Sequence, residues 1–261
     1  MVTTKKLRRP PKRAWITKWK EFLDWTDAHS DSRWVFRGLG DKSFGLIPSI
    51  GRRSNYDLAH ELAIFEIFKR RCPQFLNIDR LTSLDLLAIG QHHGVPTRLL
   101  DWTSNPLVSA YFATTAEPNS VHGKLLLPSG RVSGSALPVR PDAKKVTARI
   151  VAVSVQQKYK LDPDADFLLQ TNVSYFWPRS LTNRITDQNG LFTVHPHPNK
   201  NWEEPLLSER NVFDIPGEMR AFFQKRLFYL GIDQQRIMGG LDGVGSRLAW
   251  QYNARTGLGS Y

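Results

Sequence analysis

Cysteine is nearly absent from this sequence: Cys72 is the single one among 261 residues. A lone cysteine excludes an internal disulfide framework and any metal site built from several cysteines. No apolar run approaches the roughly 18 residues that a membrane-spanning helix needs. The N-terminus lacks the apolar stretch of a secretory signal. These absences predict a cytoplasmic protein that does not engage a membrane.

Several motifs of common enzyme classes are also missing. The chain has no GxxxxGK[ST] loop, no GxGxxG after an expected strand, no GxSxG elbow and no HExxH helix. These absences argue against a P-loop nucleotide hydrolase, an α/β-hydrolase and a zinc protease. Because no Cys, Asp or Glu stands at ligand spacing from the histidines, we expect no metal site.

Positive charge is in excess, with a formal net charge of +12. Six basic residues and no acidic one lie within the first 13 positions, so the remainder carries about +6 (12 − 6). Residues 1–13 are interpreted as a disordered basic arm. The charge favours either simple solubility or attraction to phosphate groups, as in nucleic acid.

Hydrophobic periodicity divides the rest of the chain into interleaved helices and strands. Because the elements do not alternate regularly, we predict one α+β domain over 14–261 rather than a doubly wound sheet. Segment 117–145, rich in Pro, Gly and Ser, is read as a variable excursion containing one strand, and 239–245 as a flexible connection. Helices are expected over 14–28, 57–71, 83–91, 216–230, from Ser104 or Asn105 and from 246, and strands over 34–38, 98–102, 148–155 and 192–194.

The densest polar segment runs from Gln91 to Ala113 and reads QHHGVPTRLLDWTSNPLVSAYFA. Buried polar groups are costly unless they serve each other or a ligand, so this segment is the first candidate site. His92 is either a ligand contact or a stabiliser of a helix C-terminus. Thr103 and Ser104 stand where a strand gives way to a helix, so one of them could simply be a cap. Three further residues, Thr97, Arg98 and Asp101, either bind a ligand or form a polar network that supports the site.

Arg37 lies among apolar residues in WVFRGLG. An arginine in such a strand needs an anionic partner, and its planar fork suits phosphate or carboxylate. Gly38 would let a ligand approach the backbone. The alternative is a buried ion pair, for which Asp101 is a candidate.

The motifs resemble those of the FRG domain family. Phe36-Arg37-Gly38 is similar to the motif that names the family, and the Gln91–Ala113 segment resembles its most characteristic stretch. Similarity continues at Arg184-Ile185, Gln188 and Gly190, and in the helix that follows Ile215-Pro216. The resemblance spans about 33–250.

The resemblance implies a relation to ADP-ribosyltransferases, with a mixed or antiparallel sheet core and flanking helices. Arg37 would then hold the diphosphate or ribose of NAD as substrate, and Thr103 and Ser104 would shape the nicotinamide side. The other residues implied in NAD binding are Gly38, His92, Thr97, Arg98, Asp101, Trp102 and Tyr111, the last two as surfaces for a ring.

The chain departs from the transferase pattern at its catalytic acid. No glutamate occurs over 184–194, and Gln188 is the nearest match. A carboxylate would stabilise the oxocarbenium-like centre that forms when nicotinamide leaves. The acids that remain as candidates are Glu61, Glu203 and Glu204.

Two functions are therefore expected. The first is an NAD-dependent ADP-ribosyltransferase, a bacterial toxin or anti-phage effector that modifies nucleic acid, RNA above all, and needs an antitoxin or regulatory partner. The second is a catalytically inactive module that binds a nucleotide or RNA. NAD hydrolysis without transfer is a variant of the first that sequence does not separate from it.

Overall fold

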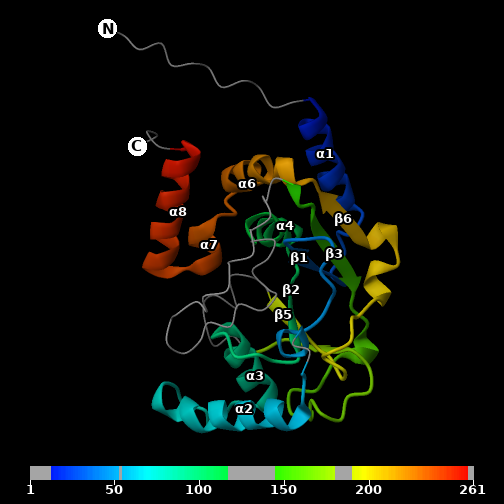
Figure 1. Cartoon of the computed structure of the whole chain (residues 1–261), viewed down its shortest axis with the longest axis vertical. Coiled ribbons are helices and arrows are strands. Elements are labelled where there is room, and N and C mark those ends of the chain that lie inside the picture. Colours follow the sequence, from blue (N-terminus) through cyan, green and yellow to red (C-terminus); the bar gives the residue numbers. More distant parts are fainter. Residues whose placement is uncertain (1–12, 53–54, 117–144, 180–189, 258–261) are drawn as a thin grey trace.

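The computed structural model describes residues 13–52, 55–116, 145–179 and 190–257. Its centre is a six-stranded antiparallel sheet with the order β4-β5-β2-β1-β3-β6 (Figure 1). Helices flank this sheet, so the α+β prediction is confirmed. The strands are β1 (Trp34–Leu39), β2 (Leu99–Thr103), β3 (Ala148–Ser154), β4 (Ser174–Phe176), β5 (Gly190–Val194) and β6 (Val212–Ile215).

Several helices begin where the sequence places capping residues. Asp57 accepts a hydrogen bond from the Ala59 amide at the start of α2, and Thr82 forms a capping box with Asp85 at the start of α3. Asn105, rather than Ser104, caps α4. The helices are α1 (Arg13–Asp27), α2 (Leu58–Arg71), α3 (Ser83–His92), α4 (Pro106–Thr115), α6 (Arg220–Tyr229), α7 (Gln234–Met238) and α8 (Gly240–Ala254).

One face of the sheet carries the helices in two groups (Figure 1). Helices α1, α4 and α6 pack over β1, β3 and β6 around a core that includes Phe22, Phe36 and Phe223. Helices α2 and α3 pack over β2, β5 and β4 around a second core that includes Leu99 and Phe192. Burial of these apolar side chains supplies the main favourable free energy of folding.

The opposite face of the sheet is covered by irregular segments and short 3-10 helices. Its core joins Val35, Trp102 and Val151 of the strands to Leu46 and Trp202 of the covering loops. Strand alternation explains the division, because successive side chains of a strand point to opposite faces.

Strands β1 and β2 separate soon after they meet. A single residue pair, Phe36 with Thr103, joins them, whereas β1 pairs with β3 along its whole length. Helix α4 packs closely against β1 beside this gap, because a Cβ at Gly38 would overlap the Ser109 carbonyl oxygen. The expected reason for this glycine, room for a ligand, was therefore incomplete: Gly38 makes room for a helix.

The C-terminal part differs most from expectation. The predicted flexible connection over 239–245 was wrong, because α8 begins at Gly240. The missing side chain of Gly243 lets α8 approach α7, where a Cβ would lie 3.1 Å from the Gln234 carbonyl oxygen. The helix predicted over 216–230 is a 3-10 turn over Gly217–Met219 followed by α6. Strands β4 and β6 and helix α7 were not predicted, since segments of three to five residues carry little periodicity.

Several predictions fall on residues that the structure does not describe. They are the basic arm up to residue 12, the strand expected within 117–145, and Gln188. Arg13, counted with the arm, is the first residue of α1. Within the described ranges, none of the helices has both the length and the apolar character needed to cross a bilayer.

Candidate functional site

A cavity of about 330 Å³ opens where β1 and β2 separate. It lies between the two helix groups, so residues from both halves of the sheet reach it. Helix α4 forms one wall, and the end of α3 another. The lining residues are Phe36, Arg37, Gly38, Leu39, Gly40, Arg52, Gln91, His92, Asp101, Trp102, Thr103, Ser109, Phe112, Ala116, Gly190 and Phe192.

Arg37 and Asp101 connect the separated strands. Arg37 Nη1 donates to Asp101 Oδ1 at 2.8 Å and to the Asp101 main-chain carbonyl at 2.6 Å. The Arg37–Asp101 ion pair considered from the sequence is therefore present. It does not satisfy the guanidinium, because Nε is buried without a partner and Nη2 has none among the described residues. Arg37 keeps donors for a further acceptor.

Arg52 brings a second guanidinium to the cavity. It ends a 3-10 helix over Ser49–Arg52, and its Nε donates to the Ile47 carbonyl at 2.8 Å. Burial, followed by repulsion from Arg37, lowers the pKa of Arg52 to about 10. Arg52 therefore stays charged at neutral pH, with both Nη atoms unpaired among the described residues.

Positive charge exceeds negative charge in this cavity. Asp101 is the single carboxylate among the described lining residues, against two guanidinium groups. Desolvation opposes its ionisation, yet Arg37 and Arg52 outweigh that effect and hold the pKa of Asp101 below its ordinary value. Asp101 is thus ionised at neutral pH, and the cavity retains one uncompensated positive charge. An anionic ligand fits this imbalance.

A short polar network holds Asp101 in place. Gln91 Nε2 donates to Asp101 Oδ1 at 3.1 Å, and Gln91 Oε1 accepts from Thr97 Oγ1 at 2.6 Å. The Thr97 amide in turn donates to Ser49 Oγ at 3.1 Å, which ties the network to the 3-10 helix that carries Arg52. Thr97 therefore supports the cavity without lining it, as one of the two readings of the sequence proposed.

Apolar surface completes the cavity beside the charged groups. Phe36, Trp102, Phe112 and Phe192 all line it. Trp102 is almost fully buried and donates from Nε1 to Thr193 Oγ1 at 2.9 Å, so its ring is held rigidly. An apolar lining with a few placed polar groups is the usual makeup of a small-molecule site.

The structure brings together six of the residues proposed from the sequence: Arg37, Gly38, His92, Asp101, Trp102 and Thr103. Thr103 accepts a hydrogen bond from the Asn105 amide at 3.1 Å, so it also helps begin α4. Ser104 is exposed and does not line the cavity. Tyr111 lies in the core between α4 and α6. Neither Ser104 nor Tyr111 lines the cavity.

Arg98 also lies away from the cavity, in a buried ion pair with Glu61. Its Nε and Nη2 donate to the two Glu61 carboxylate oxygens at 2.7 Å each, and both side chains are 3% exposed. Tyr56 donates to the same carboxylate at 2.7 Å. Arg98 and Glu61 thus anchor α2 to β2, and neither is placed to touch a ligand in the cavity.

The other candidate acids are not in the cavity either. Glu204 lines a separate hollow on the opposite face of the sheet, and Glu203 precedes it in the same loop. Gln188 lies outside the described residues, although Gly190, two positions later, lines the cavity. Among the described residues, no cluster of three or more His, Cys, Asp or Glu side chains is arranged to hold a metal ion.

Sequence reasoning missed Arg52, Gln91 and Phe112 as cavity residues. Gln91 is the first residue of the dense polar segment, so the density of polar groups in that segment could have identified it. Phe112 was read as part of an apolar helix, which it is. Arg52 had no signal, because nothing in its local pattern relates it to Arg37 or Asp101.

One known family matches the part of the chain that builds most of this cavity. Residues 32–121 match the family model of the FRG domain. This part of the chain is an FRG domain. The FRG match contains β1, α2, α3, β2 and α4, and with them every described lining residue except Gly190 and Phe192. No curated protein and no solved structure matches the chain.

Proposed function

We propose that this FRG domain is an NAD-dependent ADP-ribosyltransferase and that NAD binds in the cavity between β1 and β2. One observation carries the proposal: two guanidinium groups with unpaired donors share the cavity with one carboxylate and several aromatic rings. Arg37 and Arg52 would bind the diphosphate, for which arginine forks are suited. The ring of Phe112 would receive a planar group of the dinucleotide.

Asp101 is the carboxylate that the reaction would use. Oδ1 is held by Arg37 and Gln91, whereas Oδ2 has no partner among the described residues. The C1′–N bond to nicotinamide breaks and nicotinamide leaves with the electron pair. A positive charge then develops on the ribose, and a nearby carboxylate stabilises it. The acceptor nucleophile forms the new bond to C1′ and releases its proton.

The expected acceptor is nucleic acid, with RNA favoured over DNA. The support is the net charge of +12, which attracts a phosphate backbone. An enzyme that modified RNA without restraint would harm its own cell. A role as a bacterial toxin or anti-phage effector, held in check by an antitoxin or regulatory protein, therefore belongs to the same proposal.

A second function has its own supporting observation. No glutamate lines the cavity among the described residues, and Glu61 is committed to Arg98. A domain that keeps the anion site but lacks turnover would bind a nucleotide or RNA as a recognition module. NAD hydrolysis, with water in place of the acceptor, is the third outcome.

The decisive experiment follows labelled NAD. The pure protein is incubated with adenylate-labelled NAD and with RNA, DNA or protein from a cell extract, and each polymer is then assayed for label. We expect label in RNA, and we expect Arg37→Ala and Arg52→Gln to abolish it. Arg70→Gln is the matched control, because Arg70 is exposed at the end of α2 and does not line the cavity.

Each alternative has its own result. Free labelled ADP-ribose without labelled polymer would indicate hydrolysis. Intact NAD with all polymers, together with measurable binding of ADP-ribose, would indicate the binding module. Undiminished labelling by correctly folded Arg37→Ala, checked by circular dichroism, would overturn the assignment of this cavity.

A further inference from the structure

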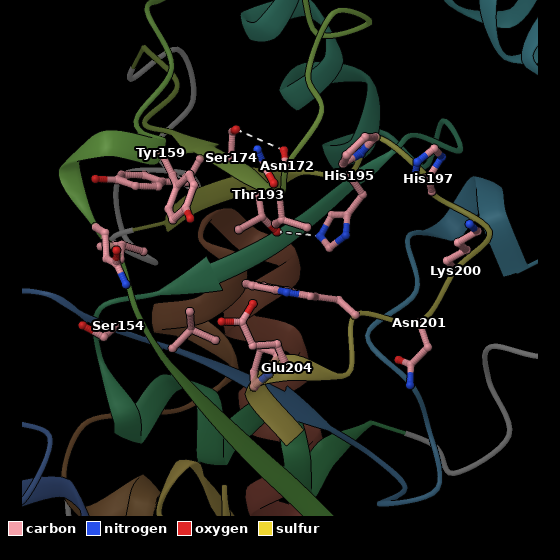
Figure 2. A pocket seen from close by; sticks show the side chains of 18 of the residues that line it. Ser154, Tyr159, Asn172, Ser174, Thr193, His195, His197, Lys200, Asn201 and Glu204 are labelled. Atoms are coloured by element: carbon pink, nitrogen blue, oxygen red, sulfur yellow. Dashed lines mark hydrogen bonds between the residues drawn. The ribbon is translucent and has the colours of Figure 1, made fainter. Parts of the chain in front are cut away.

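A second cavity, of about 490 Å³, lies on the face of the sheet that carries no long helix. Figure 2 shows Thr193 and His195 on one side of it and Asn201 and Glu204 on the other. Its walls come from β3, β4, β5 and the loop that follows β5. Of its lining residues, Trp34 alone falls within the FRG match, so this cavity belongs to the part of the chain outside that match.

The lining is aromatic and mostly uncharged. The lining includes four Trp or Tyr residues, two His, four amide side chains and four Ser or Thr hydroxyls, and Lys200 and Glu204 are its single Lys/Arg cation and carboxylate among the described residues. A ligand with a flat apolar face and polar edges fits such a lining, because rings offer stacking surfaces and amides pair with edge donors and acceptors. The rings are those of Trp34, Tyr159, Tyr175 and Trp202.

A buried chain of hydrogen bonds holds His195 in the wall of the cavity. Trp102 Nε1 donates to Thr193 Oγ1, and Thr193 Oγ1 lies 2.9 Å from His195 Nε2. Because an indole only donates, the Thr193 hydroxyl oxygen accepts from Trp102 Nε1, and it shares a second hydrogen bond with His195 Nε2. Burial, with a smaller effect of Arg37, lowers the pKa of His195 to about 3, so its imidazole is neutral at neutral pH.

The cavity continues into an open groove toward Trp177. A neighbouring hollow of about 570 Å³ shares Ser154, Val155, Gln156 and Tyr175 with it and extends to Arg33 and Trp177. Tyr175 and Trp177 lie edge to face with ring centroids 5.2 Å apart. Trp177 is 49% exposed, so its ring is available to a ligand that leaves the cavity along this groove.

Lysines accompany the rings of this groove. Lys160 Nζ lies 5.3 Å from the ring centre of Trp177, and Lys158 Nζ lies 4.7 Å from that of Tyr159. Lys200 stands at the cavity itself (Figure 2). Arg33, by contrast, is paired with Asp31 at 2.7 Å, so it contributes little net charge. Aromatic rings interleaved with unpaired lysines are the pattern of a groove for single-stranded nucleic acid.

We propose that this groove, from His195 to Trp177, binds single-stranded nucleic acid. One base enters the cavity, with its edge toward the His195 ring and the surrounding amides, and a neighbouring base stacks on Trp177. The lysines at positions 158, 160 and 200 meet the intervening phosphates. A role of the groove in holding the acceptor strand rests on the proposed transferase function. Binding of single-stranded nucleic acid itself needs no NAD.

The groove lies beside the proposed NAD cavity, where it would hold part of an acceptor strand outside the reacting nucleotide. Trp102 lines the NAD cavity proposed above and hydrogen-bonds to Thr193, which lines the second cavity. A wall of Trp102, Thr193 and His195 thus has one cavity on each side. A strand in the groove would pass beside the proposed NAD site without occupying it.

The test measures binding without NAD. Fluorescence anisotropy is recorded for the full chain with short labelled oligo(rU), oligo(rA), oligo(dT) and an RNA duplex. We expect the single strands to bind and Trp177→Ala to weaken that binding at least about fivefold, since stacking on an aromatic side chain is lost. We expect Lys160→Gln to reduce the slope of log K against log salt concentration by roughly 0.7, because one phosphate contact is lost.

A second lysine and tyrosine pair, outside the groove, serves as a control for the loss of a charge and the loss of an exposed ring. Lys225 Nζ lies 5.9 Å from the ring centre of Tyr229 on α6, and Tyr229 is itself exposed. Tyr229→Ala and Lys225→Gln should leave single-strand affinity within about twofold of the wild type. Equal losses at both pairs, tighter binding of the duplex, or no binding of any single strand would overturn the proposal.

The outcomes separate this inference from the proposed transferase. Loss of single-strand binding in Trp177→Ala, with NAD chemistry on small acceptors or water retained, supports the groove as the surface that holds the acceptor strand. Single-strand binding by a protein that leaves NAD intact supports the groove and counts against the transferase. Relative affinity for oligo(rU) and oligo(dT) identifies which polymer the groove prefers.

Discussion

Arg37 and Asp101 reach each other from opposite faces of the sheet. Arg37 is paired across β1 and β3 with Val151 on one face, whereas Asp101 is paired across β2 and β5 with Phe192 on the other. Their 2.8 Å contact is possible because β1 and β2 separate after the Phe36–Thr103 pair. The ion pair therefore spans the gap that forms the cavity, and an anionic ligand bound there would meet both strands.

Arg52→Gln tests the anion site with little risk to the fold. The variant removes a positive charge that makes one hydrogen bond to the described residues, to the Ile47 carbonyl. A hydrogen bond to a charged group contributes about 1.5–3 kcal/mol, so we expect ADP-ribose affinity to fall by about 10- to 100-fold. Isothermal titration calorimetry measures this, with Arg70→Gln as control. Wild-type affinity in Arg52→Gln would place the diphosphate elsewhere.

Glu61→Gln tests whether this buried acid is structural. The change would leave Arg98 as a buried charge without its partner, so the free energy of unfolding should fall by about 3–5 kcal/mol. Urea denaturation measures the loss. The double variant Glu61→Leu with Arg98→Met should regain most of it, because no buried charge remains. Loss of activity at undiminished stability would instead indicate a catalytic role.

Gly38→Ala tests the contact between α4 and β1. The new Cβ would overlap the Ser109 carbonyl, so the helix must move and the free energy of unfolding should fall by about 1–3 kcal/mol or more. Gly245→Ala is the matched control on α8, where a Cβ meets no heavy atom within 4 Å. That control should gain roughly 0.5–1 kcal/mol from helix propensity. Thermal denaturation distinguishes the two, and equal stability of both variants would refute the packing argument.

His195 should make stability depend on pH. Its pKa is about 3 in the folded protein, against an ordinary value of 6.5, so the unfolded chain binds the proton more readily. The stabilisation is complete above about pH 6.5 and is lost as the pH falls toward 3, at up to about 1.4 kcal/mol per pH unit. His195→Gln keeps an acceptor for Thr193 but does not titrate. Urea unfolding from pH 7 to 4 should show a smaller slope in this variant, and an unchanged slope would contradict the assignment.

The sequence by itself determined much of the scaffold. Periodic apolar positions located β1, α2, α3, α4 and β3 within a few residues, and capping residues such as Asp57 and Asn105 marked where helices begin. These signals are local, because a helix or strand is encoded by neighbours along the chain. The polar segment from Gln91 also pointed to the cavity, since burying so many polar groups needs mutual partners or a ligand.

The tertiary structure alone decided which of those polar residues share a site. Arg98 and Thr97 are neighbours in sequence, yet Arg98 binds Glu61 under α2 while Thr97 supports Gln91 beside the cavity. Arg52 joins Arg37 and Asp101 only because the chain folds back between β1 and α2. The second cavity likewise assembles residues from Trp34 to Asn211. Such juxtapositions depend on which strands pair and where β1 and β2 part, and no local pattern encodes those long-range contacts.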